Sequence, residues 1–267
     1  MPTYIISGAT GNLGRNLRRE LEVFGRVEPI ERQDLSPKKI YNLFEKTKGE
    51  KYFIHLAWPI KSVDFRSNRA NLEMLELSKK ILLVTKSFDI KILAAGSILE
   101  AGDVPVINDK ILANPQNIYA ETKCKLHEFI QQNFQDRFKW LRIANQISAF
   151  DSKHKLTPTL LSSQRKTVEI NAANNEVDAI HVSDVARAFT HSALKFHSLP
   201  SEIVVGTGQQ LQIATFAKMF YTPNIVLSNV SEPSSVKTNP AALSASGWNA
   251  KNLTAKQLYE AVIQEQW

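Results

Sequence analysis

A glycine-rich segment, Gly8-Ala9-Thr10-Gly11-Asn12-Leu13-Gly14, narrows the choice of fold more than any other part of this sequence. It lies between residues 3–7, which fit a short buried strand, and a helical pattern over residues 12–24. Glycines at such a turn let the backbone approach a pyrophosphate closely, and the helix N-terminus offers N–H groups and a positive dipole end. The pattern therefore predicts a dinucleotide site whose phosphate-binding residues are Gly8, Thr10, Gly11, Asn12, Leu13 and Gly14.

Strand-like and helical patterns alternate along the chain after this turn. Strands are expected at residues 27–30, 52–57, 89–94 and 140–143, and helices at 37–48, 71–87, 117–134 and 182–195. The expected fold class is α/β: a Rossmann-type, doubly wound parallel sheet with a small, discontinuous α+β substrate lobe. We assign residues 1–150 to the dinucleotide-binding domain, with 176–200 returning to it, and residues 151–267 mainly to the substrate-binding lobe.

Composition and charge exclude several classes of protein. The 267 residues are 43% hydrophobic and 22% charged, as in ordinary globular domains. The apolar stretches are too short for a membrane helix, and the N-terminus lacks a secretory signal pattern, so we expect a cytoplasmic protein. A single cysteine, Cys124, permits no intrachain disulfide, and no metal site is proposed. The net charge is +7, but the basic residues are scattered, so neither nucleic acid nor a membrane is expected as a partner.

The residues after the second expected strand bear on the choice between NAD and NADP. An acidic side chain there accepts hydrogen bonds from the adenosine ribose and favours NAD, whereas an arginine pairs with the 2′-phosphate of NADP. Glu31 and Arg32 therefore have opposite effects, and Arg15 on the first helix is a second candidate for the 2′-phosphate. We predict that NADP(H) is preferred and NAD(H) is possible, with these residues near the adenosine: Glu31, Arg32, Asp34 and Leu35.

A tyrosine and a lysine one helical turn apart, Tyr119 and Lys123, are candidate catalytic residues. A free phenol titrates at about pH 10, and a neighbouring ammonium should lower that pKa enough for acid–base catalysis. Ser97 follows the expected strand 89–94, and a hydroxyl at the carboxyl end of a parallel strand faces the ligand site. It would hydrogen-bond a substrate carbonyl while Tyr119 transfers the proton.

With these residues in this order, the chain resembles the extended short-chain dehydrogenase/reductases, the NAD-dependent epimerase/dehydratase family that modifies nucleotide-activated sugars. The first half is particularly similar to dTDP-4-dehydrorhamnose reductases. The resemblance covers nearly the whole length and rests on these segments: residues 8–14, Phe53-Ile54-His55-Leu56-Ala57, Asn71, Ala95-Gly96-Ser97, residues 119–123, Leu141-Arg142-Ile143-Ala144-Asn145, His181-Val182-Ser183-Asp184-Val185-Ala186 and Ser246-Gly247-Trp248.

The resemblance implies roles for further residues. Leu56 and Ala57 would line the cofactor groove through their backbones, with Trp58 at its mouth, and Tyr119 and Lys123 would also contact the cofactor. The implied substrate-binding residues are Ser97, Ile98, Tyr119 and Asn145. A homodimer built from the helices at 71–87 and 117–134 is also implied.

Departures from the family pattern narrow the expected chemistry. Ile98 and Leu99 replace the acidic pair that follows the catalytic hydroxyl in sugar-nucleotide 4,6-dehydratases, so elimination of water lacks its acid and base. In GDP-fucose synthase-type enzymes a cysteine lies two positions after the serine, and here that position is Leu99. The family usually has a Tyr-Gly pair after the serine, and here Ala101-Gly102 replaces it, which is expected to alter the sugar pocket.

These observations predict an NADP-dependent reductase of a nucleotide-activated 4-keto-6-deoxy sugar, with catalytic residues Ser97, Tyr119 and Lys123. It would work in the biosynthesis of deoxysugars or of polysaccharide precursors, lipopolysaccharide included. Two alternatives stay open: an NAD-dependent nucleotide-sugar C4-epimerase, and a non-catalytic NADP-sensing regulator of the same fold. The sequence also leaves the sugar and its nucleotide (GDP, CDP or dTDP) open.

Overall fold

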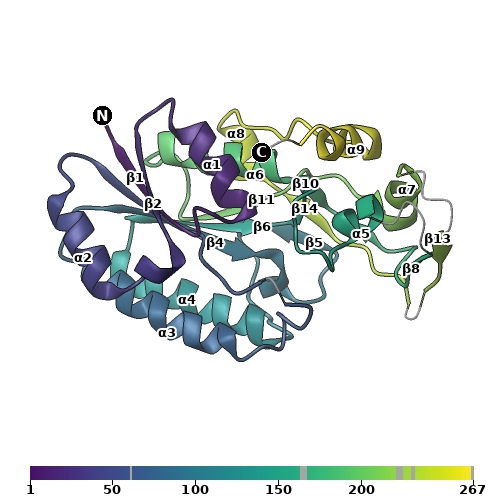
Figure 1. Ribbon diagram of the computed structural model, residues 1–267, viewed down its shortest axis with the longest axis horizontal. Helices are drawn as coiled ribbons and strands as arrows, with labels where there is room; N and C mark the ends of the chain where they lie inside the picture. Colours follow the sequence, from purple (N-terminus) through teal and green to yellow (C-terminus); the bar gives the residue numbers. More distant parts are fainter. Residues whose placement is uncertain (61, 163–166, 221–224, 230–231, 266–267) are drawn as a thin grey trace.

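The centre of the molecule is a six-stranded sheet in which all neighbouring strands run parallel (Figure 1). The computed structural model describes residues 1–60, 62–162, 167–220, 225–229 and 232–265. From one edge to the other the strands are β2 (Arg26–Ile30), β1 (Thr3–Ser7), β3 (Lys51–His55), β4 (Lys91–Ser97), β6 (Phe138–Ile143) and β11 (Glu202–Val205). The predicted Rossmann-type α/β fold is therefore confirmed.

Helices cover both faces of this sheet, with the bounds α1 (Asn12–Leu21), α2 (Pro37–Lys46), α3 (Ala70–Thr85), α4 (Ile118–Phe134) and α6 (Val182–Leu194). Helices α1 and α6 pack together on one face, and α2, α3 and α4 pack side by side on the other (Figure 1). Alternation along β1 explains the two cores, because Tyr4 and Ile6 belong to the cluster under α1 and α6, whereas Ile5 belongs to the cluster under the other helices. Helices α3 and α4 are those expected at a dimer interface, and the homodimer stays a prediction.

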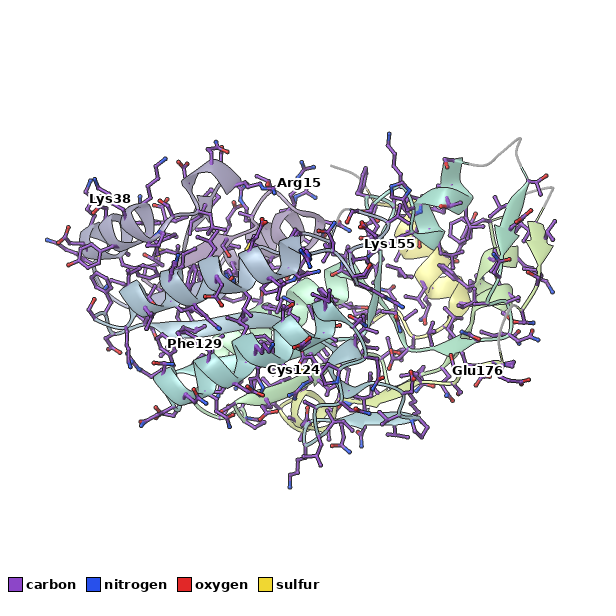
Figure 2. The ribbon with its side chains drawn as sticks, turned by 90° about the horizontal axis from the view of Figure 1, so that it is seen from below. Arg15, Lys38, Cys124, Phe129, Lys155 and Glu176 are labelled. Atoms are coloured by element: carbon purple, nitrogen blue, oxygen red, sulfur yellow. The ribbon has the colours of Figure 1, made fainter. Side chains whose placement is uncertain are left out.

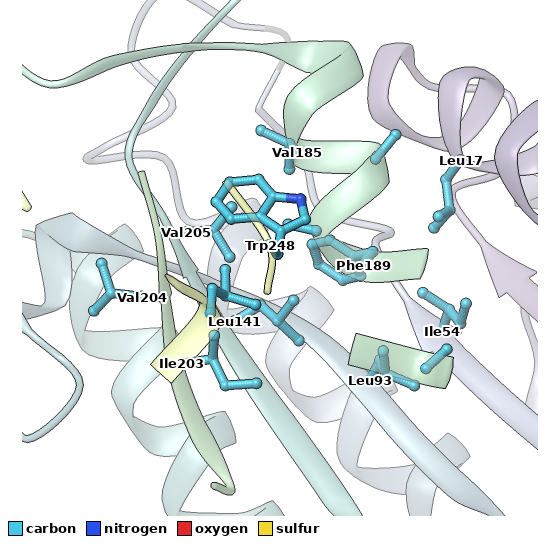
Figure 3. Close-up of a cluster of buried hydrophobic side chains, with 14 of the residues drawn as sticks. Leu17, Ile54, Leu93, Leu141, Val185, Phe189, Ile203, Val204, Val205 and Trp248 are labelled. Atoms are coloured by element: carbon cyan, nitrogen blue, oxygen red, sulfur yellow. The ribbon is translucent and has the colours of Figure 1, made fainter. Parts of the chain in front are cut away.

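The core under α1 and α6 joins distant parts of the chain (Figure 3). Leu17 of α1, Leu93 of β4 and Phe189 of α6 are fully buried in it. Trp248, from the last part of the chain, lies against this cluster with only 4% of its surface exposed. Because a large buried ring removes much apolar surface from water, Trp248 ties the C-terminal segment to the sheet.

The other elements are short strands, paired two by two, and short helices, many of them on the right of Figure 1. The pairs are β5 (Val106–Asn108) with β14 (Lys237–Asn239), β7 (Asn145–Ile147) with β10 (Ala179–His181), β8 (Val168–Ile170) with β13 (Ile225–Leu227), and β9 (Glu176–Val177) with β12 (Leu211–Gln212). The helices are α5 (Leu156–Ser162), α7 (Ile213–Lys218), α8 (Ala241–Ala245) and α9 (Ala255–Ile263). The buried carboxylate of Asp178 connects several of these segments, because it accepts hydrogen bonds from Thr207, Gly208 and Thr238. In the described part of the chain, no helix combines the length and apolar character needed to cross a bilayer.

Several elements differ from the sequence prediction, and three of the differences bear on the main sheet and the site. Helix α1 ends at Leu21 rather than residue 24, because the N–H of Gly25 closes the helix on the carbonyl of Leu21 at 3.1 Å and the chain turns into β2. Strand β4 continues to Ser97, whose Cα pairs with that of Ile143 in β6. Strand β11 was not assigned from the sequence, and it extends the sheet beyond β6.

We expect Gly14→Ala to destabilise the protein by about 1–3 kcal/mol, the usual cost of overpacking. A Cβ at Gly14 would lie 2.2 Å from the carbonyl oxygen of Gly8, and a backbone atom cannot turn away as a side chain can. The matched control is Gly11→Ala, where the same oxygen is 3.2 Å away. Urea unfolding measures both variants, and equal stability of the two would contradict the expected packing of α1 on β1.

Candidate active site

The candidate active site lies at the carboxyl edge of the main sheet, where β1, β3 and β4 end at Ser7, His55 and Ser97. The chain runs from β1 to the edge strand β2 and then returns to β3 on the other side of β1. Ligands of open α/β sheets bind at such a switch point. The glycine turn follows β1 and the segment 56–58 follows β3, so both lie at this edge with Ser97.

The glycine turn packs directly on the backbone of the segment after β3. A Cβ at Gly8, whose φ is +76°, would lie 2.8 Å from the nitrogen of Ala57, and the N–H of Leu56 donates to the carbonyl of Ser7 at 3.1 Å. Helix α1 has Gly11 at its N-cap, and a glycine has no side chain with which to cap the first N–H groups. An anionic group can therefore approach these N–H groups, so the turn fits the pyrophosphate of a dinucleotide.

The other predicted residues of this turn differ in their surroundings. Thr10 is exposed, and Leu13 packs partly buried against the core under α1. The side chain of Asn12 accepts a hydrogen bond from Ser148 at 3.1 Å and donates to Asp151 at 3.4 Å. Asn12 thus links the start of α1 to the chain beyond β6, and its role toward a cofactor stays a prediction.

The residues after β2 lie at the same edge, since Ile30 pairs with Ser7. They form a short 3₁₀ helix, η1 (Arg32–Asp34), in which Arg32 is exposed. Glu31 precedes it and is also exposed, so both side chains that bear on cofactor choice can reach a ligand. Leu35 is 8% exposed and packs in the core under α2.

Helix α4 presents Tyr119 and Lys123 to the end of β4. Its N-cap is Asn117, whose side chain accepts a hydrogen bond from the first turn at 3.0 Å. The Tyr119 phenol lies close enough to the Ser97 hydroxyl for Ser97 to lower its pKa, and the Lys123 ammonium donates to the carbonyl of Ala95 at 2.8 Å. The same ammonium lies 5.8 Å from the centre of the Tyr119 ring. The structure therefore brings the three predicted catalytic residues together.

Burial changes the protonation of both groups on α4. It raises the pKa of Tyr119 above that of a free phenol, with a further rise from Glu100, while the nearby Ser97 hydroxyl and the charge of Arg66 oppose the rise. Burial lowers the pKa of Lys123 to about 7, against the effect of Glu100. The expectation that the ammonium lowers the phenol pKa is wrong here, because Lys123 points to a carbonyl of β4 and desolvation is the larger effect. At neutral pH Tyr119 is protonated and suited to donate a proton.

Trp58 lies over the Lys123 ammonium, with Nζ 3.8 Å from the centre of its ring. This is a cation–π contact, which favours the charged form of the lysine. The indole is held in place because its N–H donates to the side chain of Asn71 at 2.7 Å, and the amide of Asn71 donates to the carbonyl of Phe65 at 2.6 Å. The sequence placed Trp58 near the cofactor groove, and the structure adds its contact with Lys123.

His55, at the end of β3, connects elements behind the site. One ring nitrogen lies 2.7 Å from the Ser7 hydroxyl and the other 2.8 Å from the Ser78 hydroxyl. Burial lowers the pKa of His55 to about 3, and the charge of Lys123 contributes, so the ring is neutral at physiological pH. His55 therefore connects β3 to β1 and to α3 through hydrogen bonds, as a neutral group.

Glu100 is a residue near the site that sequence analysis missed. It lies in the 3₁₀ helix η2 (Ile98–Ala101), is 1% exposed, and accepts a hydrogen bond from the N–H of Ser97 at 2.6 Å. The signal was present, because a serine followed three residues later by a glutamate is the pattern of a capping box. Ile98, in the same turn, is 6% exposed and packs in the core, and its predicted contact with substrate stays a prediction.

Asn145 follows β6 at the same edge of the sheet and is exposed. Its backbone N–H donates to the carbonyl of Asp178 at 3.1 Å, and its side chain donates to the same oxygen at 3.2 Å. Its predicted role toward substrate stays a prediction. Within the ranges that the structure describes, no three His, Cys, Asp or Glu side chains gather as a metal site would require.

Comparison with known proteins gives a family match and several matches of fold. The model of the NAD dependent epimerase/dehydratase family matches residues 4–206, and a search of curated proteins finds no match. UDP-glucose 4-epimerase of Thermus thermophilus, in complex with NAD, is 17% identical over 98% of both chains, with a TM-score of 0.80. RMD from Pseudomonas aeruginosa, complexed with NADPH, is 20% identical over 98% of both chains, with a TM-score of 0.78. MoeE5, in complex with UDP-glucuronic acid and NAD, is 18% identical over 98% of both chains, with a TM-score of 0.80.

We expect Lys123→Met to stabilise the cofactor-free protein, by roughly 1–3 kcal/mol at pH 6, and by less as the pH rises. The unfolded lysine keeps its proton up to its ordinary pKa of 10.5, whereas the folded lysine loses it above about 7. The cost of burying the charged form is therefore complete below pH 7 and is relieved between pH 7 and 10.5. Part of the gain is offset because methionine leaves the carbonyl of Ala95 without its donor.

Urea unfolding at pH 6 and pH 9 tests this expectation. The control is Lys125→Met on the same helix, which removes an exposed ion pair with Glu121. Because the pKa of Lys125 is raised by Glu121, this lysine stays charged over that range and its variant should show no pH-dependent difference. A stabilisation by Lys123→Met that does not change with pH would contradict the assigned protonation.

Proposed function

Because this chain belongs to the NAD-dependent epimerase/dehydratase family, we propose that it is an NADP-dependent reductase of a nucleotide-activated 4-keto-6-deoxy sugar. The predicted family is confirmed by the match, and with it an NAD(P)-dependent enzyme. The observation that carries the finer proposal is the cluster of Ser97, Tyr119 and Lys123 at the same edge of the sheet as the glycine turn. A non-catalytic sensor has no need of a buried, protonated phenol at this place.

In the proposed reaction NADPH would supply a hydride to the keto carbon. The Ser97 hydroxyl would donate a hydrogen bond to the carbonyl oxygen and hold it beside Tyr119. The phenol proton of Tyr119 would move to that oxygen as its double bond to carbon becomes a single bond. The Ser97 hydroxyl and the charge of Arg66, which oppose the rise of the Tyr119 pKa, would stabilise the phenolate until solvent returns the proton. Lys123, 5.8 Å from the tyrosine ring, would contact the cofactor.

The protonation state of Tyr119 supports reduction rather than oxidation. Burial raises the pKa of this phenol, so the protonated form is dominant at neutral pH. A reductase needs that form at the start of each turnover. A C4-epimerase must first remove a proton from a sugar hydroxyl, for which the phenolate is needed.

The neighbours of Ser97 and Lys123 support a reaction without elimination of water and without epimerisation at C3 or C5. Ile98 and Leu99 are apolar, so neither can act as acid or base in the loss of water. Cys124 lies on α4 next to Lys123 (Figure 2), and burial raises the pKa of its thiol to about 12. Such a thiol is a poor base at neutral pH, which disfavours proton abstraction from a sugar carbon.

A nucleotide-sugar C4-epimerase is the second candidate function, and the likeness in fold to a UDP-glucose 4-epimerase favours it. The two functions differ in how they use the cofactor, since an epimerase returns the hydride within one catalytic cycle and a reductase consumes NADPH. A nicotinamide absorbance band retained by the purified protein would support the epimerase. An empty protein that oxidises NADPH in the presence of a 4-keto sugar nucleotide would support the reductase.

We expect Tyr119→Phe to lower kcat by roughly 10²–10⁴, because the variant has no phenol proton to donate. NADPH affinity should stay within a few-fold. The assay follows NADPH oxidation with a panel of GDP-, CDP- and dTDP-linked 4-keto-6-deoxy sugars, which also identifies the nucleotide. Tyr41→Phe, at a half-exposed tyrosine of α2, is the control and should keep full activity. Full turnover by Tyr119→Phe would refute the proposed proton donor.

We expect the unmutated protein to bind NADPH more tightly than NADH, and Arg32→Ala to remove most of that difference. A guanidinium beside the 2′-phosphate makes charge-assisted hydrogen bonds worth about 1.5–3 kcal/mol, and Arg15 on α1 (Figure 2) is the second candidate partner. Arg26→Ala, at the opposite end of β2, removes a pairing with Glu28 and serves as the control. Fluorescence titration of the unmutated protein and both variants gives the Kd values for NADPH and NADH, and tighter binding of NADH than of NADPH by the unmutated protein would overturn the assignment.

A further inference from the structure

A buried carboxylate, that of Glu100, lies directly behind the candidate catalytic hydroxyls. Its Oε1 accepts a hydrogen bond from the N–H of Ser97 at 2.6 Å. Its Oε2 accepts from the indole N–H of Trp140 at 2.9 Å and from Nε of Arg142 at 3.0 Å. With 1% of its surface exposed, Glu100 has no access to a substrate and acts only through the groups that it touches.

The contacts of Glu100 identify its ionised form. Ser97, Trp140 and Arg142 each present an N–H to the carboxylate, and none of these three groups can accept a carboxyl proton. Burial raises the pKa of Glu100, while Arg142 and the two N–H donors oppose that rise. Charge-assisted hydrogen bonds to all of these donors require the anion, so Glu100 and Arg142 form a buried ion pair.

The first consequence concerns the direction of the Ser97 hydroxyl. Glu100 closes a capping box, in which its carboxylate holds the Ser97 N–H while the Ser97 Oγ accepts the N–H of Leu99 at 3.2 Å. An oxygen that accepts a hydrogen bond from its own turn has its proton left to donate outward. The capping box therefore fixes Ser97 as a donor toward the carbonyl site.

The second consequence concerns charge. The negative charge of Glu100 favours the protonated forms of Lys123 and Tyr119, both on α4. Of the other groups that face this cluster, Arg142 comes from β6 and is paired with Glu100 itself, and His55 from β3 is neutral. Arg66, before α3, faces Tyr119, and Cys124 of α4 carries no charge because burial raises its pKa. Among the groups that these contacts identify, Glu100 is the anion beside the lysine.

We propose that Glu100 is a positioning residue, which fixes the Ser97 hydroxyl as a donor and supplies the negative charge that balances the buried Lys123 ammonium. The proposal rests on the proposed function, because it assigns to Ser97, Tyr119 and Lys123 the roles given above. It goes beyond that function by assigning a task to a side chain that touches neither substrate nor cofactor.

The test compares Glu100→Gln with Glu202→Gln. Glutamine keeps the size of Glu100 but removes the charge, and it must present an N–H or a neutral oxygen to the donors around it. Glu202 accepts from the other side of the Arg142 guanidinium at 2.7 Å, so Glu202→Gln disturbs the same arginine without touching Ser97. A loss of stability caused by disturbing Arg142 should therefore appear in both variants, whereas the catalytic effects should appear only in Glu100→Gln.

For Glu100→Gln we expect kcat to fall by about 10- to 100-fold with substrate KM within about three-fold, the range for a misplaced catalytic group. Loss of the negative charge lowers the pKa of both Lys123 and Tyr119, so the basic limb of the pH–rate profile should move to lower pH by about one pH unit. NADPH affinity, measured by fluorescence without substrate, should also begin to fall at lower pH than in the unmutated protein. Glu202→Gln should leave both the pH–rate profile and the pH dependence of NADPH affinity unchanged.

The conservative variant Glu100→Asp separates charge from geometry and is available if Glu100→Gln does not fold. Aspartate keeps the charge but is one methylene shorter, so it should preserve the basic limb while still lowering kcat. Equal effects of Glu100→Gln and Glu202→Gln on kcat and on both pH profiles would overturn the proposal, as would a displaced basic limb in Glu100→Asp. An unmutated protein without NADPH binding or turnover would instead contradict the proposed function, so the two failures are distinguishable.

Discussion

The close approach of three backbone segments at Gly8 determines how the rest of the site is arranged. A Cβ at Gly8 would lie 2.8 Å from the backbone nitrogen of Ala57, and a Cβ at Gly14 would lie 2.2 Å from the carbonyl oxygen of Gly8. Because glycine has no side chain, β1, α1 and the chain after β3 can pack backbone against backbone. No side chain at the N-cap of α1 bonds the first N–H groups of the helix. The same contact fixes the segment that follows Ala57, which carries Trp58 onto the Lys123 ammonium. A continuous series of contacts therefore connects the glycine turn to Lys123.

Behind these contacts, charges of alternating sign link the site to the outer strand of the sheet, and all of them except the partly exposed Glu202 are buried. Lys123 faces Glu100, Glu100 pairs with Arg142, and Arg142 pairs with Glu202 at 2.7 Å. Removing each ion from water costs several kcal/mol, and an apolar replacement is often as stable. These ion pairs are therefore not expected to increase the stability of the fold. Their effect is instead on Lys123, because the negative charge of Glu100 favours the charged lysine where burial lowers its pKa to about 7.

Local patterns in the sequence were enough to predict the parallel sheet, the glycine turn and the meeting of Ser97 with Tyr119 and Lys123. Each depends on spacing within one element or on the common edge at which parallel strands end. The contacts of Trp58 with Lys123 and of Glu100 with Arg142 join residues far apart in the chain, so no local pattern specifies them. The pKa of Tyr119 was predicted in the wrong direction for a related reason. Helical spacing shows that a lysine is near, but the desolvation that exceeds its effect depends on the packed structure.

The resulting site has one chemical bias. Ser97 has its oxygen engaged by the N–H of Leu99, so its proton points away from the turn. Tyr119 is protonated because burial raises its pKa, and Lys123 carries only donor hydrogens when charged. Ser97 and Tyr119 therefore both offer hydrogen to the same small region, and neither is a strong base at neutral pH. The group best matched to such a region is an oxygen that gains negative charge during the reaction, and the oxygen of a ketone that receives a hydride is of this kind. A sugar hydroxyl about to be oxidised would need the opposite polarity, so this arrangement of protons supports the proposed reduction.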